Sequence, residues 1–349
     1  MPSELSCSGK KRERLSIPKS AVIRGCGAYY PERVLSNADL EHMVDTSDEW
    51  ITTRTGIKER RIAAPDEASS DLAMKAAQKA IDMAGWEIDD IDTIIVGTVT
   101  PDYMFPSCAC TLQGKLGAKN AVAFDISAAC SGFIYGLSLS RALLVSGQAR
   151  RILLVGVETL SRIVDYSERS TCVLFGDGAG AVVLEGSPEP DVGVKSVAIG
   201  SDGVHGELLY MPAGGSRNPA THDTVEKKLH SMKMNGNEVF KIAVRGMEAI
   251  SRKAIDAAAC TIDDIDLFIP HQANFRMIDA TAKRLGIPEE KVVVTVDRFG
   301  NTSASSIPIA LDEAVRDGRI KEGDMLGMVA FGAGLTWGAS VVRWEGPAR

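Results

Sequence analysis

An internal repeat constrains this chain more than any other feature of its sequence. Residues 79–92 read KAIDMAGWEIDDID and residues 253–266 read KAIDAAACTIDDID, and an apolar run typical of a buried strand follows each. A second matched pair comes later in each half: FGDGAGAVVLEG begins at Phe175, and FGAGLTWGASVVRWEG begins at Phe331. Two motifs in the same order make coincidence between alanine-rich helices a poor explanation. We therefore predict that the chain folds as two similar halves.

Strand-like and helix-like stretches alternate within each half. The β-branched runs 152–157 and 292–296 are typical of strands, and the amphipathic stretches 71–83 and 274–285 are typical of helices. This alternation indicates an α/β fold with mainly parallel sheets and helical cover. We expect two pseudo-symmetric halves that form an αβαβα layered structure, with the functional residues where the halves meet. The polar segment 213–234 is expected to be a loop near the mouth of the site.

The halves are expected to join near residues 186–194, GSPEPDVGV, because Pro, Gly and acidic residues are typical of a linker. We predict an N-terminal half over 21–188 and a C-terminal half over 189–349. Residues 1–20 are expected to form a flexible basic extension. No apolar segment follows its charges, so we do not interpret it as a secretory signal.

Composition excludes several classes of protein. With 45% hydrophobic and 24% charged residues, the 349-residue chain is typical of soluble globular proteins. A net charge of −7 argues against non-specific nucleic-acid binding, and no apolar run reaches the roughly 20 residues of a membrane helix. The seven cysteines form an odd set in which only Cys108 and Cys110 are close. We expect reduced thiols, a cytoplasmic protein and no metal site.

Cys130 is the strongest candidate nucleophile. It falls on a short turn between a strand-like run, AVAFDIS, and a stretch with helical periodicity, SGFIYGLSLSRALLVSG. A helix N-terminus favours negative charge, so we expect a stabilised thiolate, a lowered thiol pKa and free N–H groups that can bind an oxyanion. On position alone, a small buried hydrophobic residue is an equally good interpretation, because most free cysteines are of that kind.

His271 and Asn301 are the candidate partners of this cysteine. His271 follows the apolar run LFIP and precedes a helical stretch, and we predict that it holds in the second half the strand-to-helix position of Cys130 in the first. A nucleophile needs a proton partner, although a purely structural histidine is the alternative. Asn301, in GNTSA, is either a turn residue or a second hydrogen-bond donor. The glycine turn FGAGLTWG, 331–338, could complete an oxyanion hole.

Three motifs in this order, AACSGF at Cys130, PHQAN at His271 and GNTSA at Asn301, resemble the Cys-His-Asn triad of the β-ketoacyl-acyl carrier protein synthase III family. The segment TSDEWITTRTGIKERRIA, which begins at Thr46, resembles that family more specifically than its cousins. The resemblance covers about residues 23–344. It implies the thiolase fold and a condensing enzyme that initiates type II fatty acid synthesis.

The resemblance also implies a reaction course. A short acyl-coenzyme A acylates Cys130, and His271 and Asn301 then support decarboxylation of malonyl-acyl carrier protein and hold the enolate oxygen. The resulting carbanion equivalent attacks the acyl-enzyme and gives a β-ketoacyl-acyl carrier protein. The backbone N–H groups of Cys130 and Ala333 hold the oxyanion of the acyl steps, Ala333 standing where the family has a glycine. Acyl-coenzyme A is a substrate, so no cofactor is implied.

Substrate contacts follow from the same resemblance. Trp50 would stack on adenine, while arginines would meet adenine or phosphate. The implied coenzyme A contacts are Thr46, Trp50, Arg54, Arg169, Gly236, Phe240, Asn274 and Arg276. The family is homodimeric, and Phe105 of one subunit is expected to close the acyl pocket of the other. Because Phe105 is bulky, we expect a short pocket and acetyl as the starter group.

Acyl carrier proteins are acidic, so we expect a basic entrance despite the negative net charge. The candidate docking residues are Lys241, Arg276, Lys283 and Arg284. A solvated helix face is the alternative interpretation of these charges.

Other activities fit the sequence less well. A biosynthetic thiolase would need a second cysteine in FGAGLTWG, a chain-elongating synthase would need a second histidine in place of Asn301, and type III polyketide synthases lack the TSDEW motif. An acyltransferase of the same fold that does not condense could keep all three residues. A non-enzymatic binding protein remains a separate class. The sequence leaves open the starter group, the role of the extension, and whether the pathway is primary or secondary metabolism.

Overall fold

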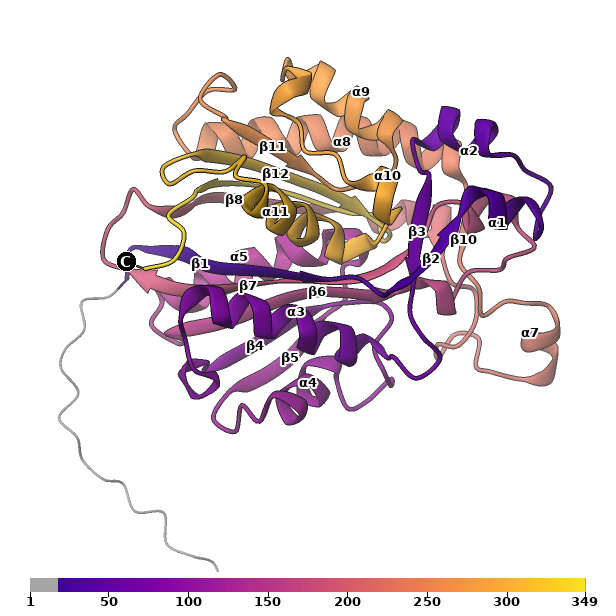
Figure 1. The fold of residues 1–349 in the computed structure, drawn as a ribbon, viewed down its shortest axis with the longest axis horizontal. Coiled ribbons are helices and arrows are strands. Elements are labelled where there is room, and N and C mark those ends of the chain that lie inside the picture. Colours follow the sequence, from indigo (N-terminus) through magenta and orange to yellow (C-terminus); the bar gives the residue numbers. More distant parts are fainter. Residues whose placement is uncertain (1–17, 349) are drawn as a thin grey trace, which may run out of the picture.

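The computed structural model describes residues 18–348 and contains two stacked β-sheets with helices on both sides and between them (Figure 1). The first sheet has the strand order β1-β7-β6-β4-β5 and the second has the order β11-β12-β13-β8. The strands of the first sheet are β1 (Ser20–Tyr29), β4 (Thr93–Gly97), β5 (Val122–Ile126), β6 (Arg151–Thr159) and β7 (Asp177–Ser187). Those of the second are β8 (Gly193–Ser201), β11 (Leu267–Pro270), β12 (Met325–Gly332) and β13 (Thr336–Arg343).

The two sheets repeat one topology. When the second sheet is listed as β8-β13-β12-β11, each strand has a counterpart in β1-β7-β6-β4. Val292 forms a parallel bridge with Phe268 of β11 and so lies where the first sheet has β5. The repeated motif leads from α3 (Ser69–Ala84) into β4, and again from α8 (Gly236–Ala257) into β11. The predicted repeat is therefore confirmed.

Both sheets are mixed rather than mainly parallel. Strand β4 is parallel to β5 and β6, but β7 is antiparallel to both of its neighbours, β1 and β6. In the second sheet β13 is likewise antiparallel to β12 and β8. Only residues 333–335 separate β12 from β13, and a parallel connection needs a dozen or more residues. The prediction of mainly parallel sheets was wrong because it ignored such short turns.

Five layers result from this arrangement. Helices α3 and α4 (Cys108–Leu116) cover the outer face of the first sheet, and α8 and α9 (Phe275–Leu285) cover that of the second (Figure 1). Helices α5 (Gly132–Val145) and α11 (Ser306–Arg316) lie between the sheets and contact both. The αβαβα architecture expected from the sequence is confirmed.

Glycines allow the middle layer to approach the first sheet closely. A Cβ atom on Gly156 of β6 would lie 2.2 Å from the carbonyl oxygen of Ala304, and one on Gly97 of β4 would lie 2.9 Å from the carbonyl carbon of Gly132. Real Cβ atoms do not reach such distances, so larger residues at these places would force the layers apart.

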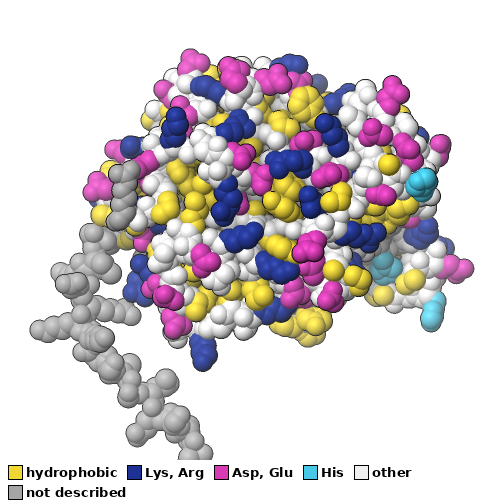
Figure 2. All heavy atoms as spheres, viewed as in Figure 1, with side chains coloured by type: hydrophobic (Ala, Val, Ile, Leu, Met, Phe, Trp, Pro, Cys, Tyr) yellow, Lys and Arg dark blue, Asp and Glu magenta, His cyan; other side chains and the backbone are white. Residues whose placement is uncertain are grey.

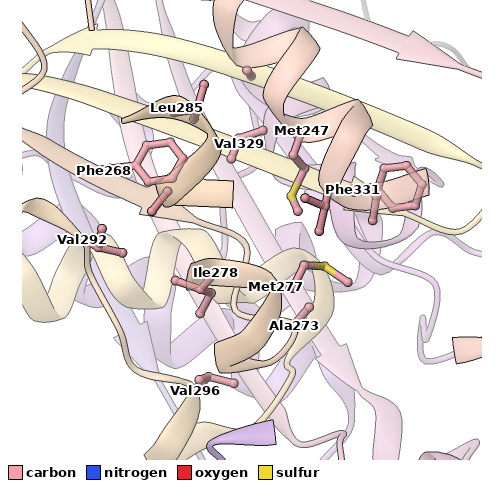
Figure 3. Packing of buried hydrophobic residues seen from close by; sticks show 14 of the residues in the cluster. Met247, Phe268, Ala273, Met277, Ile278, Leu285, Val292, Val296, Val329 and Phe331 are labelled. Carbon is pink, nitrogen blue, oxygen red and sulfur yellow. The ribbon is translucent and has the colours of Figure 1, made fainter. Parts of the chain in front are cut away.

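The outer core of the second half is built by α8, α9 and the strands beneath them. Figure 3 shows Met247 from α8 together with Met277 and Ile278 from α9, in the same cluster as Val329 and Phe331 of β12. Met277 and Phe331 also line a cavity of about 210 Å³. One wall of that cavity is therefore set by the packing of α8 and α9 on the sheet.

Two smaller excursions flank the layers. One carries β2 (Arg33–Ser36), α1 (Asn37–Glu41), α2 (Asp48–Thr55) and β3 (Glu59–Ile62). The other, predicted as a loop over 213–234, contains α7 (His222–Glu226) and β10 (Lys233–Met234), which pairs with β9 (Leu209–Tyr210). Met234 of β10, the last residue of that segment, lines the cavity wall, so the segment reaches the site as expected. The short helices α6 (Arg169–Cys172) and α10 (Val296–Phe299) complete the structure.

The linker between the two halves lies where the sequence predicted it, but the first strand begins earlier than expected. Residues 188–192 connect β7 with β8 and thus the first sheet with the second, inside the predicted linker 186–194. Ser20 already belongs to β1, so the basic extension ends earlier than predicted, and residues 1–17 lie outside the described residues. Among the described residues, none of the helices combines the length and apolar character needed to cross a membrane.

Candidate active site

A single cavity of about 210 Å³ brings Cys130, His271 and Asn301 together. Cys130 comes from the first half of the chain, whereas His271 and Asn301 come from the second. The site therefore lies where the halves meet, as the sequence predicted. Its other walls are mainly apolar and include Phe331 and Met234.

The cysteine sits on a constrained turn between β5 and α5. Ala129 precedes it with a φ of 46°, a left-handed conformation that side chains other than glycine rarely adopt. A Cβ atom on Gly332 would lie 2.7 Å from the backbone nitrogen of Cys130, so the glycine turn after β12 packs directly on this amide. A side chain at position 332 would therefore clash with this amide.

The expected lowering of the thiol pKa is wrong. Cys130 is 8% exposed, and burial raises the pKa of its thiol to about 12. The negative charge of Glu158 contributes to this increase, while a hydrogen bond from Ser303 opposes it. Desolvation of a buried thiolate outweighs what its neighbours supply, so the resting group is the neutral thiol.

His271 follows β11 and is held as a neutral imidazole. Its ring Nδ1 lies 2.7 Å from the Ser306 hydroxyl, and that hydroxyl also accepts a bond from the backbone N–H of Gln272 at 3.3 Å. Burial lowers the pKa of His271 to about 3. When Ser306 donates to Nδ1, the proton of the neutral ring lies on Nε2, which has no partner among the described residues. Nε2 can then donate to a ligand in the cavity.

The predicted equivalence of the His271 and Cys130 turns is wrong. His271 follows β11, and the counterpart of β11 in the first sheet is β4, after which comes Thr98. The counterpart of the Cys130 turn is instead the turn before α11, over Ser303–Ser305, where Ser303 has a φ of 51°. The equivalence failed because both turns follow an apolar run, and the sequence does not show which strand of its sheet each run forms.

Asn301 is both a turn residue and a donor directed into the cavity. Its backbone N–H donates to Leu174 O at 2.8 Å, and its carbonyl accepts from Gly176 N at 3.0 Å. The side-chain Oδ1 accepts the backbone N–H of Ser303 at 2.9 Å. With Oδ1 fixed in this way, the amide NH₂ is the group left for a ligand, as a second neutral donor beside His271.

Three polar residues of the site's surroundings were missed by sequence reasoning. Ser306 orients the imidazole, the backbone N–H of Ser303 donates to the Asn301 side chain, and Glu158 is a fully buried carboxyl that accepts the Ser303 hydroxyl. The serines stand among the small hydroxyl residues that follow Asn301, which was a usable signal. Glu158 stands near the end of an apolar strand run, RILLVGVETL, and a charged residue in such a run is a signal that was overlooked.

Five of the predicted coenzyme A contacts line the cavity toward its mouth: Arg54, Gly236, Phe240, Asn274 and Arg276. The Arg276 guanidinium lies 5.7 Å from the centre of the Phe240 ring. Asn274 also caps α9, since its Oδ1 accepts the Met277 N–H at 2.9 Å. The mouth is thus formed by the starts of α8 and α9 and the end of α2.

The other three predicted coenzyme A contacts lie outside the cavity lining. The guanidinium of Arg169 is 4.6 Å from the centre of the Trp50 ring, and that of Arg54 is 5.0 Å from it. Arg169 also donates to the carbonyl of Asp45 at 2.9 Å. The hydroxyl of Thr46 is buried without a hydrogen-bond partner among the described residues. Arg54 and Arg169 therefore both stand against one half-buried indole, that of Trp50.

Most of the predicted docking cations are paired with carboxylates. Lys241 contacts Glu238 at 2.8 Å, Lys283 contacts Asp279 at 2.8 Å, and Arg284 contacts Glu248 at 2.5 Å. Figure 2 shows Lys and Arg side chains interspersed with Asp and Glu on the face in view. Of the four candidates, only Arg276 is given no carboxylate partner by the described ion pairs.

Phe105 and Ala333 also lie outside the cavity lining. Phe105 is 87% exposed and its neighbour Met104 is 84% exposed, so both side chains project from the chain. Ala333 follows Gly332 in the turn after β12, and its carbonyl accepts the Thr336 hydroxyl at 3.1 Å.

Within residues 18–348, no group of three or more His, Cys, Asp and Glu residues is arranged to hold a metal ion. The six cysteines of this part of the chain are free thiols.

Comparison with known proteins supports the assignment of the site. Family models described as 3-oxoacyl-[acyl-carrier-protein] synthase III match residues 124–203 and, for the C-terminal part of that family, residues 255–344. A crystal structure of 3-oxoacyl-[acyl-carrier-protein] synthase III from Aquifex aeolicus is 48% identical, with a TM-score of 0.86 over 93% of this chain and 100% of that one. The fold and the site define a condensing enzyme of the thiolase fold.

Sequence identity to curated relatives identifies the family of this chain. The β-ketoacyl-[acyl-carrier-protein] synthase III of Caldanaerobacter subterraneus is 56% identical over 326 residues, which is 93% of this chain and 98% of the relative. That of Clostridioides difficile is 52% identical over 324 residues, with the same coverage. The chain belongs to the β-ketoacyl-[acyl-carrier-protein] synthase III family, and it is a condensing acyltransferase that initiates fatty acid synthesis.

Proposed function

We propose that this enzyme condenses a short acyl-coenzyme A, acetyl-coenzyme A first, with malonyl-acyl carrier protein through an acyl-Cys130 intermediate. The observation that carries the proposal is the convergence of one buried thiol and two neutral hydrogen-bond donors on one cavity. A nucleophile with neutral donors suits a reaction whose charge develops first on a thioester oxygen and then on an enolate.

The first half-reaction transfers the acyl group to sulfur. The Cys130 sulfur attacks the thioester carbonyl and coenzyme A leaves. The oxyanion of this step is held by the backbone N–H of Cys130 and, we infer, by that of Ala333. The packing of Gly332 against the Cys130 amide supports this assignment, since it brings the turn that contains Ala333 next to the nucleophile. Backbone donors tolerate the change from the family's glycine to Ala333.

The second half-reaction uses His271 and Asn301. Nε2–H of a neutral imidazole and the NH₂ of Asn301 donate to the thioester oxygen of the malonyl group, and they stabilise the enolate that decarboxylation leaves. The lowered pKa of His271 supports the role of a neutral donor over that of a general base. The enolate carbon then attacks the acyl-enzyme, and the Cys130 sulfur leaves.

Coenzyme A would bind along the mouth and over the indole of Trp50. We infer that adenine stacks on this ring and displaces Arg169, whose guanidinium lies over the indole. Arg54 and Arg276 are placed to meet phosphate groups, because both guanidinium groups lie at the mouth of the cavity. The remaining inferred contacts are Thr46, Gly236, Phe240 and Asn274.

A homodimer is part of the proposal. Tyr103, Met104 and Phe105 are 62%, 84% and 87% exposed, an apolar tip that would be buried against a second copy of the chain. Phe105 of one subunit would close the acyl pocket of the other, and its size favours acetyl as the starter. We further infer a cytoplasmic enzyme that needs no cofactor, with its two halves divided near residues 188 and 189.

Among the docking candidates, we assign Arg276 the largest part in binding the acidic carrier protein. Lys241, Lys283 and Arg284 contribute less, because each already faces a carboxylate that partly cancels its charge. Docking at the starts of α8 and α9 would direct the malonyl arm into the mouth of the cavity.

The decisive experiment separates acylation from condensation. Radiolabelled acetyl-coenzyme A should label the wild-type enzyme stoichiometrically and the Cys130→Ala variant not at all. Cys110→Ala, which removes an exposed thiol, is the matched control and should label fully. Addition of malonyl-acyl carrier protein should release carbon dioxide and consume the label.

Two results would change the assignment. Label transfer to another acceptor without carbon dioxide release would indicate an acyltransferase that does not condense. An absence of labelling altogether would indicate a binding protein. A panel of acetyl-, isobutyryl- and octanoyl-coenzyme A tests the starter, and preference for octanoyl would contradict the role given to Phe105.

A further inference from the structure

A fully buried arginine lies beside the Asn301 turn and has no part in the reaction described above. Arg60 of β3 is 0% exposed. Its Nη1 donates to the carbonyl of Leu35 at 3.1 Å and to Asn37 Oδ1 at 2.9 Å, and its Nη2 donates to the carbonyl of Val173 at 2.8 Å. The guanidinium thus joins the excursion that contains β2 and α1 to the segment that follows α6.

No carboxylate forms an ion pair with Arg60 within residues 18–348, and its Nε has no hydrogen-bond partner there. A buried charge without a counter-charge is costly, and an apolar side chain of similar size would fill this place without that cost. What an apolar side chain cannot supply is a rigid fork of donors that reaches acceptors on two separate segments. The surroundings of Arg60 therefore indicate that its hydrogen bonds, rather than its volume, are the reason for an arginine here.

The segment that Arg60 holds also holds Asn301. The Asn301 N–H donates to the carbonyl of Leu174 at 2.8 Å, and the Gly176 N–H donates to the carbonyl of Asn301 at 3.0 Å. Leu174 directly follows Val173, whose carbonyl accepts the guanidinium. The backbone that places the Asn301 side chain is therefore fixed to a segment that Arg60 anchors one residue away.

The stem of Arg60 packs against the same turn. A Cβ atom on Gly300 would lie 3.2 Å from the Cβ of Arg60, and one on Gly176 would lie 3.1 Å from it. Helix α10, which ends directly before Gly300, contacts β3, and Figure 1 shows the two elements next to each other. Both the stem and the fork of Arg60 thus restrict where the turn with Asn301 can lie.

Asn37 continues the connection to α2. Its Nδ2 donates to Asp48 Oδ1 at 2.8 Å and to Thr52 Oγ1 at 3.3 Å, and both acceptors belong to α2. The same helix carries Trp50 and Arg54, to which the proposed function assigns coenzyme A. A series of hydrogen bonds through Asn37 and the guanidinium therefore connects the coenzyme A helix with the segment that holds the condensation donor.

Resting on the proposed function, we propose that Arg60 is a positioning residue for condensation, which fixes segment 173–176, and through it the Asn301 amide, against the excursion that carries α2. Arg60 does not touch substrate, since it lies outside the cavity lining. Decarboxylation requires the Asn301 amide at the enolate oxygen, and a misplacement of about 1 Å can cost on the order of 10²-fold in rate. Acylation of Cys130 uses backbone donors of other turns and does not need this segment.

The test is a double-mutant cycle between Arg60 and Asn301, with carbon dioxide release from malonyl-acyl carrier protein as the measurement. Arg60→Met alone should lower this rate on the order of 10²-fold. In the Asn301→Ala background the same substitution should lower the residual rate no more than about threefold, because the amide that Arg60 positions is already absent. Single-turnover acetylation of Cys130 at saturating acetyl-coenzyme A should change no more than about threefold in each variant.

Arg61→Met is the matched control, because it makes the same substitution at the next residue of β3. The Arg61 guanidinium pairs with Glu59 at 3.6 Å and lies 5.5 Å from the centre of the Tyr30 ring, outside the connection described. Both rates should stay within about twofold of wild type. Arg60→Lys tests the proposal even if Arg60→Met fails to fold, since lysine keeps the charge and most of the stem but lacks the fork. It should show the same pattern with a smaller loss.

A merely structural role for Arg60 predicts a different pattern. Its replacement would then lower decarboxylation by the same factor with and without the Asn301 amide, or would lower acetylation as much as decarboxylation. Either result would overturn the proposal. Failure of the proposed function is distinguishable, because Asn301→Ala alone would then leave carbon dioxide release unchanged, and the role given to Arg60 would fall with it.

Discussion

Each half of the molecule places one turn of 3₁₀ helix in front of its central helix: Ala129–Ser131 in front of α5 and Ser303–Ser305 in front of α11. Both turns begin with a residue of positive φ, 46° at Ala129 and 51° at Ser303. Cys130 in the first corresponds to Ala304 in the second. The first turn carries the nucleophile, whereas the second carries an alanine that packs against Gly132 and Gly156.

This difference shows that both copies of the repeat form the fold, whereas only the first copy carries the nucleophile. Polar groups beside the second turn serve the first: Asn301 lines the shared cavity, the Ser303 side chain lowers the pKa of the Cys130 thiol, and Ser306 orients His271. The strand ends differ in the same manner. Thr98 after β4 bonds to buried Glu158, whereas His271 after β11 faces the cavity.

The two turns would not differ in function if a cysteine in the second turn could replace Cys130 in the first. Cys130→Ala should lower acetyl transfer on the order of 10⁵-fold, because Cys130 is the only thiol among residues 18–348 that lines the cavity. Adding Ala304→Cys should not restore it, since the Ala304 Cβ packs 3.3 Å from the ideal Cβ position of Gly132. Single-turnover acetylation of each variant is the measurement. Recovery in the double variant would show that the turns are interchangeable.

The Asn301→Ala variant tests whether Asn301 acts in condensation but not in acylation. Loss of one neutral donor to the enolate oxygen should lower the rate of malonyl-acyl carrier protein decarboxylation about 10²–10³-fold. Acetylation of Cys130 should change little, because the backbone donors of that step remain. Carbon dioxide release and acyl-enzyme formation are measured separately. Equal losses in both would place Asn301 in the acyl step as well.

Gly156→Ala tests whether the second turn must approach the first sheet. The new Cβ would lie 2.2 Å from Ala304 O, so we expect a loss of roughly 1–3 kcal/mol in the free energy of unfolding. Gly203→Ala is the control, because nothing lies within 4 Å of its Cβ position. Denaturant titration measures both. If Gly156→Ala lowered the free energy of unfolding no more than Gly203→Ala does, the close approach of the layers would not be required for stability.

The burial of His271 makes a prediction about acid stability. The pKa of His271 in the folded enzyme is about 3, below the unfolded value, so its contribution is complete above pH 6.5 and is lost as the pH falls. Between pH 6.5 and 4.5 the loss should be about 2 kcal/mol. His271→Gln should show a shallower decline over the same interval. Unfolding free energies with parallel slopes for the two proteins would contradict the buried neutral imidazole.

The smallest effects concern the carrier protein. Arg276→Glu should raise the KM for malonyl-acyl carrier protein by about five- to tenfold at low salt, and Lys283→Glu by no more than about twofold. The reason is that Lys283 already faces Asp279 at 2.8 Å, whereas Arg276 stacks on Phe240. Steady-state kinetics at two salt concentrations measure both. Equal effects would mean that the Lys283 pair opens on docking.

Much of this architecture could be predicted from the sequence. The matched helix–strand motifs at 79–92 and 253–266 gave the two halves, and the layered arrangement followed from them. Cys130 and His271 were identified from their places at strand ends, and the cavity contains both. Local patterns suffice for these features because they depend on neighbouring residues alone.

Features set by distant residues could not be predicted. The pKa of Cys130 depends on how completely the second half covers it, and the sequence offered only the favourable helix terminus. The antiparallel pairing of β7 depends on strand order, which a run of β-branched residues does not reveal. Glu158 accepts a hydrogen bond from Ser303, which stands 145 positions away in the chain.

The placement of α5 and α11 between the sheets has a consequence for how the enzyme fails. Because the nucleophile comes from the first half of the chain and its two donors come from the second, a small slip of one half along the other separates the reacting groups while every strand and helix remains formed. Heating should therefore abolish turnover at a lower temperature than it melts secondary structure.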